Sequence, residues 1–351
     1  MKFLFYLAKL YSIPVVMPLV EYINQYTNDE IAFFVSEKVF TQMKEENRFF
    51  NVNLIKEIKQ AINYQPDYCI TPGNYIDYRL PGIKVQIFHG VGIEKASHYE
   101  IRHFFDVYLT SGPIVTEKFI ELQKKYKYFL VYETGWLKFD HIIKYNTKNL
   151  NELYNIPANK KIILYAPTFS NKLQSAECLL PSIPGIIKDD EFWLLKLHEL
   201  KKNKYLPLIE KLNKDNFKII NDYDITPLLH LANVMISDTS SVIYEFMALD
   251  KPVITFNTSD RKDKGINITE ISELRPALDQ CINFPEEMSS IRKKHLKEVN
   301  PYLNGEISKN IYSTLIKIKK NNELLNKKKP LNLLRKIKIH YHELIKKGYL
   351  K

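Results

Sequence analysis

The sequence predicts an α/β fold of two doubly wound, Rossmann-like domains that face each other across a cleft. Short apolar segments alternate along the chain with amphipathic segments, which is typical of parallel sheets covered by helices. The 351 residues, 45% of them hydrophobic, are enough for two domains of ordinary size. A polar segment at 144–160 divides the apolar segments into two series. We therefore expect domains at 1–150 and 151–316, followed by a basic tail at 317–351.

Eleven segments are predicted to be strands because they are short apolar runs bounded by polar or turn-forming residues. The first series is Phe3–Leu7, Ile31–Val35, Tyr68–Thr71, Val85–Phe88, Val107–Thr110 and Phe129–Glu133. The second is Lys161–Ala166, Trp193–Leu197, Phe217–Ile220, Val234–Ser237 and Pro252–Asn257. Amphipathic segments at 53–63 and 115–126 are expected to be helices between strands. Two domains of this kind and of similar size, facing across a cleft, describe a GT-B architecture.

The N-terminal residues are predicted to be a strand at 2–7 and a helix that ends near Tyr26. The apolar run at 3–22 is not expected to span a membrane, because two prolines and two charged residues interrupt it. A span usually needs about 20 apolar residues without such breaks.

Composition argues against several other classes of protein. Cys69, Cys178 and Cys281 are far apart, so neither a zinc site nor a disulfide framework is expected, which fits a reducing cytoplasm. No GxGxxG or GxxxxGK[ST] motif occurs, so the chain lacks the dinucleotide and P-loop fingerprints. No carboxylate cluster suited to Mg²⁺ stands out, and we expect neither a metal nor another cofactor.

A run of oxygen-bearing side chains separates one predicted strand from the helix that follows it. The strand at 234–237 leads into DTSS at 238–241, and an apolar helical segment follows at 242–249. One such side chain can cap a helix by accepting a hydrogen bond from its first free N–H groups. Four are more than a cap needs, and a helix N-terminus also favours an anion. Capping and phosphate binding are both open on this pattern.

A histidine follows the predicted strand at 85–88. His89 precedes Gly90, and Gly90 and Gly92 would let the backbone come close to a ligand. A histidine in this place can act as a general base, because its ordinary pKa lies near neutrality. The alternative is a packed histidine that bonds to a neighbouring carbonyl group.

Two further strands run into polar residues. The strand at 161–166 ends in Pro167 and Thr168. Lys196 and His198 alternate with leucines near the end of the strand at 193–197, so both are expected on one face of it. Polar side chains inside a parallel sheet are costly unless they serve a ligand or partner.

These motifs together resemble those of the CDP-glycerol glycerophosphotransferase family, which includes the TagB/TagF-like enzymes of teichoic acid synthesis. The resemblance covers roughly residues 65–260 and rests on residues Phe88-His89-Gly90, Thr134-Gly135, Tyr165-Ala166-Pro167-Thr168, Lys196-Leu197-His198, Ser237-Asp238-Thr239-Ser240-Ser241 and Lys251-Pro252. It implies a GT-B enzyme that transfers a polyol phosphate from a CDP-activated donor to an acceptor hydroxyl. The sequence departs from the common family pattern in reading HGVGIEK where HGxxLK is usual, and in having Ser170 and Glu199 after the other two motifs.

The resemblance implies roles for individual residues. His89 would be the base on the acceptor side, while His198, as imidazolium, would stabilise the donor phosphates with the hydroxyl cluster. Glu245, one helical turn beyond that cluster, would reach the ribose. The predicted catalytic residues are His89 and His198, and the predicted donor-binding residues are Gly90, Thr168, Lys196, Asp238, Thr239, Ser240, Ser241 and Glu245. No metal is required by this scheme, because these groups can neutralise the phosphates.

Other functions remain open on the sequence. A GT-B sugar transferase and a nucleotide-sugar 2-epimerase-like enzyme would share the fold, and fold alone does not fix function. A non-catalytic scaffold would not need both histidines. Nucleic acid is not an expected partner, because the basic tail lacks aromatic platforms for bases. The acceptor, which we expect to be lipid-linked or a glycan, and the polyol, whether glycerol, ribitol or another, are not identified.

The tail carries almost all of the net charge. Residues 317–351 contain twelve Lys and Arg and two Glu, a net of +10 of the total of +11. After Pro330, which suits the first turn of a helix, apolar residues recur at helical spacing. A helix docked across the domains and a solvated tail are alternatives. The basic amphipathic pattern predicts binding to an anionic membrane, which would place a cytoplasmic enzyme at the inner face of the cell membrane.

Overall fold

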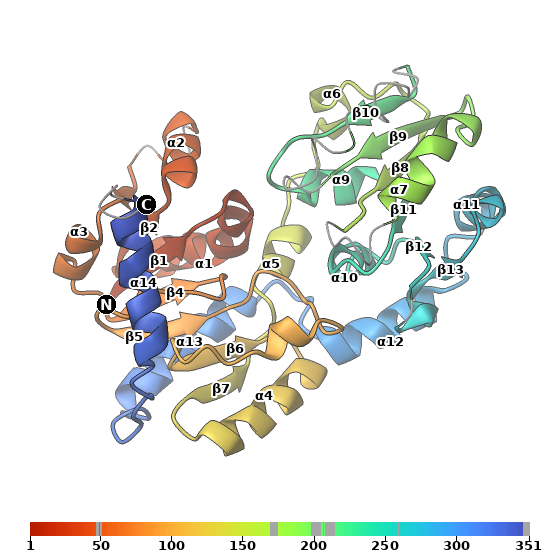
Figure 1. The fold of residues 1–351 in the computed structure, drawn as a ribbon. Coiled ribbons are helices and arrows are strands. Elements are labelled where there is room, and N and C mark those ends of the chain that lie inside the picture. The colour runs from red at the N-terminus through yellow and green to blue at the C-terminus, as the bar shows by residue number, and fades with distance from the viewer. Residues whose placement is uncertain are drawn as a thin grey trace.

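The chain folds into two lobes, each built on a parallel β-sheet (Figure 1). The computed structural model describes residues 1–46, 49, 51–168, 175–197, 205, 207, 215–258 and 260–346, with side chains as far as Tyr341. Both sheets are flanked by helices, so the expected α/β architecture of two Rossmann-like domains is confirmed.

The N-terminal sheet has the strand order β3-β2-β1-β4-β5-β6-β7, and every pairing in it is parallel. Its strands are β1 (Lys2–Leu7), β2 (Glu30–Val35), β3 (Asn53–Ile55), β4 (Tyr68–Thr71), β5 (Ile83–Gln86), β6 (Val107–Thr110) and β7 (Leu130–Glu133). The helices of this half are α1 (Ile13–Tyr26), α2 (Glu37–Glu45), α3 (Ile58–Asn63), α4 (Pro113–Tyr126), α5 (Lys138–Ile143) and α6 (Leu150–Leu153). The strand order reverses between β1 and β4, and ligands of such sheets bind beyond the carboxyl ends of the strands at that point.

The C-terminal sheet has the order β10-β9-β8-β11-β12-β13 and is also parallel throughout. Its strands are β8 (Lys161–Tyr165), β9 (Glu191–Leu195), β10 (Phe217–Ile219), β11 (Val234–Ser237), β12 (Val253–Phe256) and β13 (Ile266–Ile268). The helices are α7 (Ala176–Leu179), α9 (Thr226–Leu231), α10 (Val242–Met247), α11 (Leu274–Asn283), α12 (Ser289–Val299), α13 (Ile307–Lys320) and α14 (Leu333–Lys346). Here the order reverses between β8 and β11.

All eleven predicted strands are present, and most have the expected limits within two residues. Long apolar runs identify them because strands of a parallel sheet are buried on both faces. Two short strands, β3 and β13, were not expected, and the segment at 53–63 was wrongly taken as a single helix. Its first three residues pair with β2 instead. The helix at 115–126 and the N-terminal strand and helix are confirmed.

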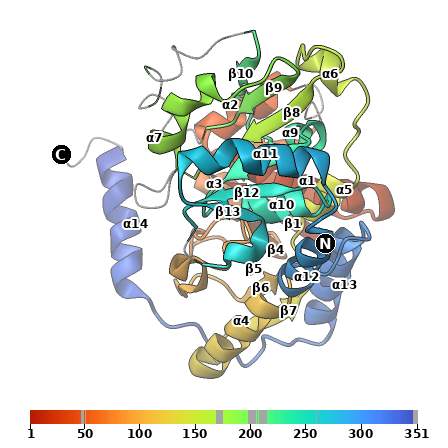
Figure 2. The ribbon, with the colours of Figure 1, turned by 90° about the vertical axis from the view of Figure 1, so that its right-hand side faces the viewer.

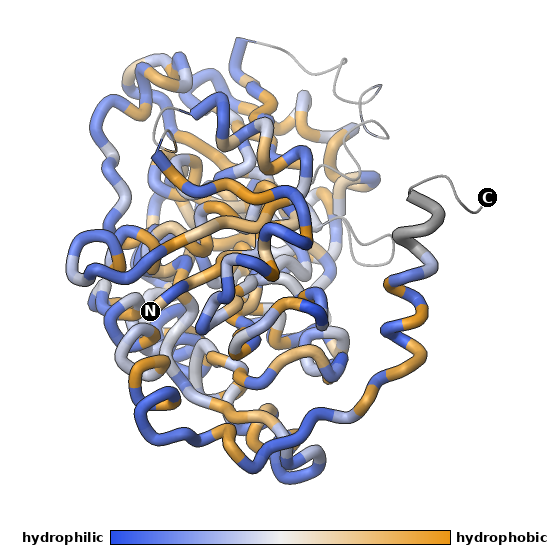
Figure 3. Tube along the Cα trace, turned by 90° about the vertical axis from the view of Figure 1, so that its left-hand side faces the viewer, coloured by the Kyte–Doolittle hydropathy of each residue, from blue (hydrophilic) through white to orange (hydrophobic). Residues whose placement is uncertain are grey.

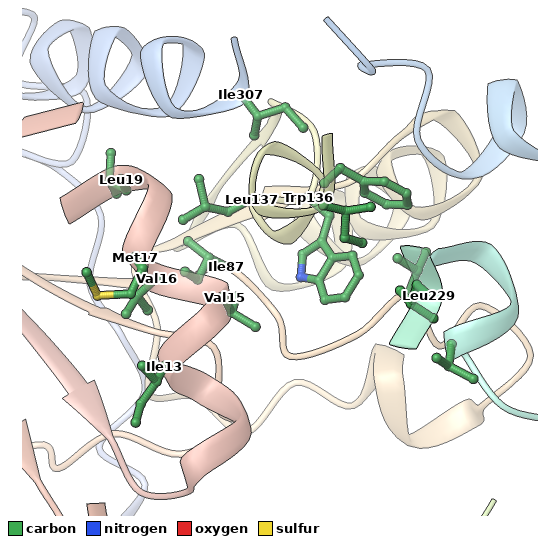
Figure 4. Close-up of a cluster of buried hydrophobic side chains, with 14 of the residues drawn as sticks. Ile13, Val15, Val16, Met17, Leu19, Ile87, Trp136, Leu137, Leu229 and Ile307 are labelled. Atoms are coloured by element: carbon green, nitrogen blue, oxygen red, sulfur yellow. The ribbon is translucent and has the colours of Figure 1, made fainter. Parts of the chain in front are cut away.

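The largest hydrophobic cluster extends across both lobes, and each lobe has a further cluster of its own. The cluster shared by the lobes joins Val15 of α1, Leu137 at the start of α5 and Leu229 of α9 (Figure 4). Ile307 of α13 belongs to the same cluster. Because this cluster crosses the junction, we expect the two halves to unfold together rather than one at a time.

The chain also returns from the second lobe to the first. The buried carboxylate of Asp140 on α5 accepts hydrogen bonds from the backbone N–H groups of Ile307 (3.1 Å) and Ser308 (2.8 Å), and so caps α13. The Tyr68 hydroxyl of β4 donates to the carbonyl of Leu315 (2.5 Å). The domain limits at 150 and 316 remain predictions, and residues 307–320 pack on the N-terminal sheet.

The tail forms a helix that lies along the outside of the N-terminal lobe (Figures 1 and 2). It begins at Leu333, so Pro330 lies before the helix and not in its first turn as expected. No helix within the described residues is both long and apolar enough to cross a bilayer.

Candidate active site between the two lobes

His89 lies beyond the carboxyl end of β5, beside the loops that follow β1 and β4. Its Nδ1 is 3.3 Å from the carbonyl oxygen of Pro72, and its ring lies 5.7 Å from that of Tyr11. A carbonyl oxygen can only accept, so Nδ1 carries the proton and Nε2 keeps its lone pair. The histidine therefore makes the carbonyl contact of a packed residue and is also in the tautomer that a base requires.

The surroundings of His89 favour its neutral form. Part of the side chain reaches solvent, yet surrounding protein lowers its pKa, against the opposing effect of the Pro72 carbonyl. The positive charges of Lys95 and Arg102 lower this pKa further. A neutral imidazole can accept a proton from an acceptor hydroxyl.

His89 follows a residue whose backbone has a left-handed conformation. The preceding residue, Phe88, has φ +58°, and its carbonyl oxygen accepts a 3.0 Å hydrogen bond from the indole nitrogen of buried Trp136. The Phe88 ring stacks on His98, whose centroid is 4.7 Å away. Left-handed conformations are uncommon away from glycine and persist only where the surroundings hold them. Trp136 and His98 are such surroundings, and neither was singled out from the sequence.

On the opposite lobe, Asp238 organises the loops at the β8–β11 switch point. Its carboxylate accepts hydrogen bonds from the backbone N–H of Thr168 (2.9 Å) and from both the N–H (3.0 Å) and the hydroxyl (3.1 Å) of Ser175. Asp238 is fully buried, and burial raises its pKa to about 6 despite these bonds. Both carboxylate oxygens accept hydrogen bonds from the protein, so Asp238 holds the loops of the site in place. Thr168 takes part through its backbone N–H.

The hydroxyl cluster, residues 238–241, lies against the histidine loop, which is the loop after β5 that carries His89. The two meet at the junction of the lobes. A Cβ added to Gly90 would lie only 3.0 Å from the Ser241 Oγ. A side chain at this position would therefore require the Ser241 hydroxyl to move by a few tenths of an ångström. Ser240 and Ser241 are partly exposed, and Ser241 makes no side-chain hydrogen bond to cap α10. Of the two interpretations of the hydroxyl cluster, capping of α10 by the Ser241 side chain is not observed.

Other predicted site residues are placed less completely. β9 ends at Leu195, so Lys196 lies just past the strand rather than within it, and its N–H still bonds to the Tyr165 carbonyl (3.0 Å). His198 lies outside the described residues. Thr239 is buried directly after Asp238.

Glu245 is engaged by the other lobe. Its Oε2 is 2.7 Å from Nζ of Lys138 on α5, and both side chains are less than a tenth exposed. The ribose contact of Glu245 stays a prediction, and the carboxylate already has this cationic partner. No pattern in the sequence points to Lys138, which lies three residues after Thr134-Gly135.

Two residues that match the family pattern have structural roles. The Ser237 hydroxyl donates to the carbonyl of Ala166 (2.7 Å), tying the end of β11 to β8. The Lys251 ammonium donates to the carbonyls of Leu229, His230 and Ala232 at the end of α9. Both bind backbone groups that have no strand or helix partner, so they hold the strand ends that carry the site.

Within the described ranges, no group of three or more His, Cys, Asp or Glu side chains is arranged to hold a metal ion. The expectation that no metal is required remains a prediction, since His198 and its neighbours lie outside these ranges.

The two lobes bring the loop that carries His89 against the hydroxyl cluster. Comparison with known proteins shows which family has this arrangement of motifs. The family model described as CDP-Glycerol:Poly(glycerophosphate) glycerophosphotransferase matches residues 85–317. That match includes His89 and the whole DTSS segment. The chain belongs to this family.

Curated relatives carry related names. A teichoic acid glycerol-phosphate primase of Bacillus spizizenii is 28% identical over 249 residues, which is 64% of this chain and 63% of that protein. One with the same name from Bacillus subtilis is 35% identical over 126 residues, covering 35% of this chain and 32% of that protein. The chain thus matches less than two thirds of the length of these relatives.

Solved structures confirm the fold. The wall teichoic acid polymerase TagF superposes with a TM-score of 0.66 at 19% identity, covering 92% of this chain and 89% of that one. A UDP-GlcNAc 2-epimerase from Neisseria meningitidis superposes with a TM-score of 0.61 at 16% identity, covering 90% and 100%. At these identities the likeness establishes the GT-B fold and not the reaction.

Proposed function

We propose that this family member transfers a polyol phosphate, glycerol phosphate, from CDP-glycerol to an acceptor hydroxyl in the synthesis of a cell-surface polymer of the teichoic acid or capsule type. The observation that carries the proposal is the contact of the histidine loop with the hydroxyl cluster, at Gly90 and Ser241, inside the region matched by the family. That contact would hold an acceptor-side base within reach of a donor bound on the other lobe.

The reaction would proceed as a direct displacement. The acceptor hydroxyl oxygen attacks the distal phosphorus of the CDP-polyol, the bond from that phosphorus to the bridging oxygen breaks, and CMP leaves with the bridging oxygen. The hydroxyl proton passes to Nε2 of His89. The Ser240 and Ser241 hydroxyls, together with the predicted imidazolium of His198, would stabilise negative charge on the phosphates. No step in this scheme requires a metal or another cofactor.

A sugar transferase or a 2-epimerase-like enzyme is the second candidate, because such enzymes share this fold. A donor panel separates the two. The purified protein is incubated with CDP-glycerol, CDP-ribitol and UDP-sugars, and the nucleotide released is identified. The proposal expects CMP from CDP-glycerol and no turnover of UDP-sugars, whereas UDP release or epimerisation would overturn it.

We also propose that the enzyme binds the inner face of the cell membrane through α14, close to a lipid-linked acceptor. The helix docks on the N-terminal lobe through Arg335, which pairs with Glu100 (3.1 Å), and His340, which bonds to the Tyr78 hydroxyl (2.7 Å); Ile339 also packs on a hydrophobic cluster of that lobe. These contacts leave other apolar residues of the helix exposed. Leu334 is 84% exposed and Ile337 is 62% exposed.

These exposed apolar residues on a strongly basic tail support the lipid partner (Figure 3). Each basic residue near an anionic surface contributes about 1 kcal/mol, and salt screens that attraction. Co-sedimentation with anionic and neutral vesicles tests the proposal. Binding should favour anionic vesicles and fall with salt, and it should be lost on truncation after Leu325.

A charge-preserving control is available in the same helix. Leu334, Ile337 and Tyr341 changed together to Ser keeps every basic residue, and it should also weaken binding if these residues enter the lipid. Full binding by this variant and by the truncated chain would exclude α14 as the contact.

A further inference from the structure

The N-terminal lobe contacts α10 through residues on a single face of that helix. Ser241 and Tyr244 are three residues apart and Glu245 is four beyond Ser241, so the three lie on one side of the helix. Ser241 faces Gly90, the Tyr244 hydroxyl donates to Glu94 (2.7 Å), and Glu245 pairs with a lysine of α5. The loop from His89 onward is therefore fixed against the helix that begins at the hydroxyl cluster.

Glu94 is the anchor of that loop. Its Oε1 is 2.7 Å from Nζ of Lys264, and the two side chains are 7% and 1% exposed. Burial alone would raise the pKa of Glu94, but Lys264 and the Tyr244 hydroxyl outweigh it and hold this pKa below its ordinary value. Glu94 stands where the common family pattern HGxxLK has its lysine. In this protein its carboxylate forms an ion pair with Lys264.

Lys95 is the next residue, in an extended backbone conformation with φ −103° and ψ 115°. The backbone turn over 92–95, closed by a 3.0 Å hydrogen bond from the Lys95 N–H to the Gly92 carbonyl, joins Lys95 to the loop that carries His89. The side chain is partly buried. In the described part of the chain, its ammonium has no hydrogen bond and no ion pair.

The nearest charges show where Lys95 lies. Burial lowers its pKa, while Asp238 of the DTSS segment and Glu94 oppose that effect, and its own charge lowers the pKa of His89. Lys95 is thus within electrostatic range of both halves of the site. Asp238 does not satisfy it, because that carboxylate is bonded to Thr168 and Ser175.

A partly buried ammonium without an anion is unfavourable, so the site is suited to receive one. We propose that Lys95, supplied by the acceptor-side lobe, binds the diphosphate of the donor and stabilises charge on the leaving CMP. This inference rests on the proposed function. HGVGIEK is one residue longer than the common pattern HGxxLK. Of its last two residues, Glu94 would then hold the lobes together and Lys95 would contact the substrate.

Ligands that differ only in their phosphates test the assignment. Binding of CDP-glycerol, CDP and cytidine is measured by calorimetry for wild type and for Lys95→Ala, Lys95→Arg and the exposed-lysine control Lys118→Ala. A charge-assisted contact to phosphate predicts about 10- to 100-fold weaker binding of CDP and CDP-glycerol by Lys95→Ala. Cytidine binding should change less than about twofold, because a nucleoside has no phosphate to lose. Lys95→Arg should keep most of the affinity, and Lys118→Ala should match wild type.

A pH profile tests whether Lys95 lies close enough to His89 for its charge to act on the proposed base, and an unchanged acid limb would contradict that placement. Removing the positive charge of Lys95 should raise the pKa of His89, so the acid limb of the kcat/KM profile should move to higher pH. Arg102 and His98 also face His89 and are unchanged in the variant.

The outcomes separate the two levels of inference. Wild type that binds neither CDP nor CDP-glycerol would overturn the proposed function and Lys95 with it. Wild-type binding with equal affinity in Lys95→Ala would overturn only the role of Lys95. Equal losses for cytidine and CDP, or a loss in Lys95→Arg as large as in Lys95→Ala, would assign Lys95 to packing and also overturn it.

Discussion

Replacing Lys138 by Met should destabilise the whole protein, because it leaves a buried carboxylate without its cation. The Lys138 ammonium lies 2.7 Å from Glu245, with side chains 9% and 7% exposed. Burial alone would raise the pKa of Asp224, but its hydrogen bond to His141 and, less strongly, the Lys138 charge lower it. Methionine retains the length of the side chain and removes the charge.

The expected magnitude follows from the burial of the pair. Breaking a buried ion pair by removing one partner costs about 3–5 kcal/mol, because the remaining charge stays out of water. An exposed pair is worth about 0–1 kcal/mol. The pair joins the two lobes across the shared hydrophobic cluster, so the loss should appear in one cooperative transition.

Urea unfolding followed by circular dichroism measures this loss, with the free energy extrapolated to water. Lys118→Met is the matched control, because Lys118 pairs with Glu121 on the exposed face of α4. Changing both members of the buried pair, Lys138→Met with Glu245→Leu, should restore much of the stability. A Lys138→Met loss no larger than that of the control, or no recovery in the double variant, would refute this reasoning.

Three further predictions concern catalysis. His89→Ala should lower turnover by about 10²- to 10⁴-fold while leaving donor binding intact, and near wild-type turnover would make His89 structural. Ser240→Ala and His198→Ala should each weaken donor binding or the chemical step, the lost contact being worth about 1.5–3 kcal/mol; calorimetry and turnover unchanged in both variants would exclude a phosphate contact. Because the pKa of His89 is lowered, its neutral form persists to lower pH, so the midpoint of the acid limb of wild-type kcat/KM should lie below about pH 6.5; a midpoint above that value would contradict the assigned base.

Much of the fold could be predicted from the sequence because parallel strands are buried on both faces and read as continuous apolar runs. The two missed strands have three residues each, and Asn53–Ile55 carries a polar first residue. So short a run gives no periodicity that separates a strand from the start of a helix. The start of α14 was also misplaced, since a proline is compatible with either the first turn or the segment before it.

The site could be predicted only in part. Strand ends followed by reactive residues pointed to His89, which lies beyond β5, and to the DTSS segment, which follows β11 at the β8–β11 switch point. The sequence could not show that the Asp238 carboxylate turns inward to hold Thr168 and Ser175, because that depends on the conformation of a distant loop. The Glu94–Lys264 pair joins residues 170 positions apart, and no local pattern reveals such a contact.

The fate of the distal phosphate tests the central claim most directly. CDP-glycerol labelled with ³²P at the phosphate next to glycerol is incubated with the protein and a membrane lipid fraction as acceptor. Transfer of a polyol phosphate predicts that the label moves to the acceptor, with one unlabelled CMP released for each label transferred, and that His89→Ala slows the transfer by about 10²- to 10⁴-fold. Label that remains with the nucleotide as CDP would instead show cleavage on the glycerol side of that phosphate, and it would contradict the proposed reaction.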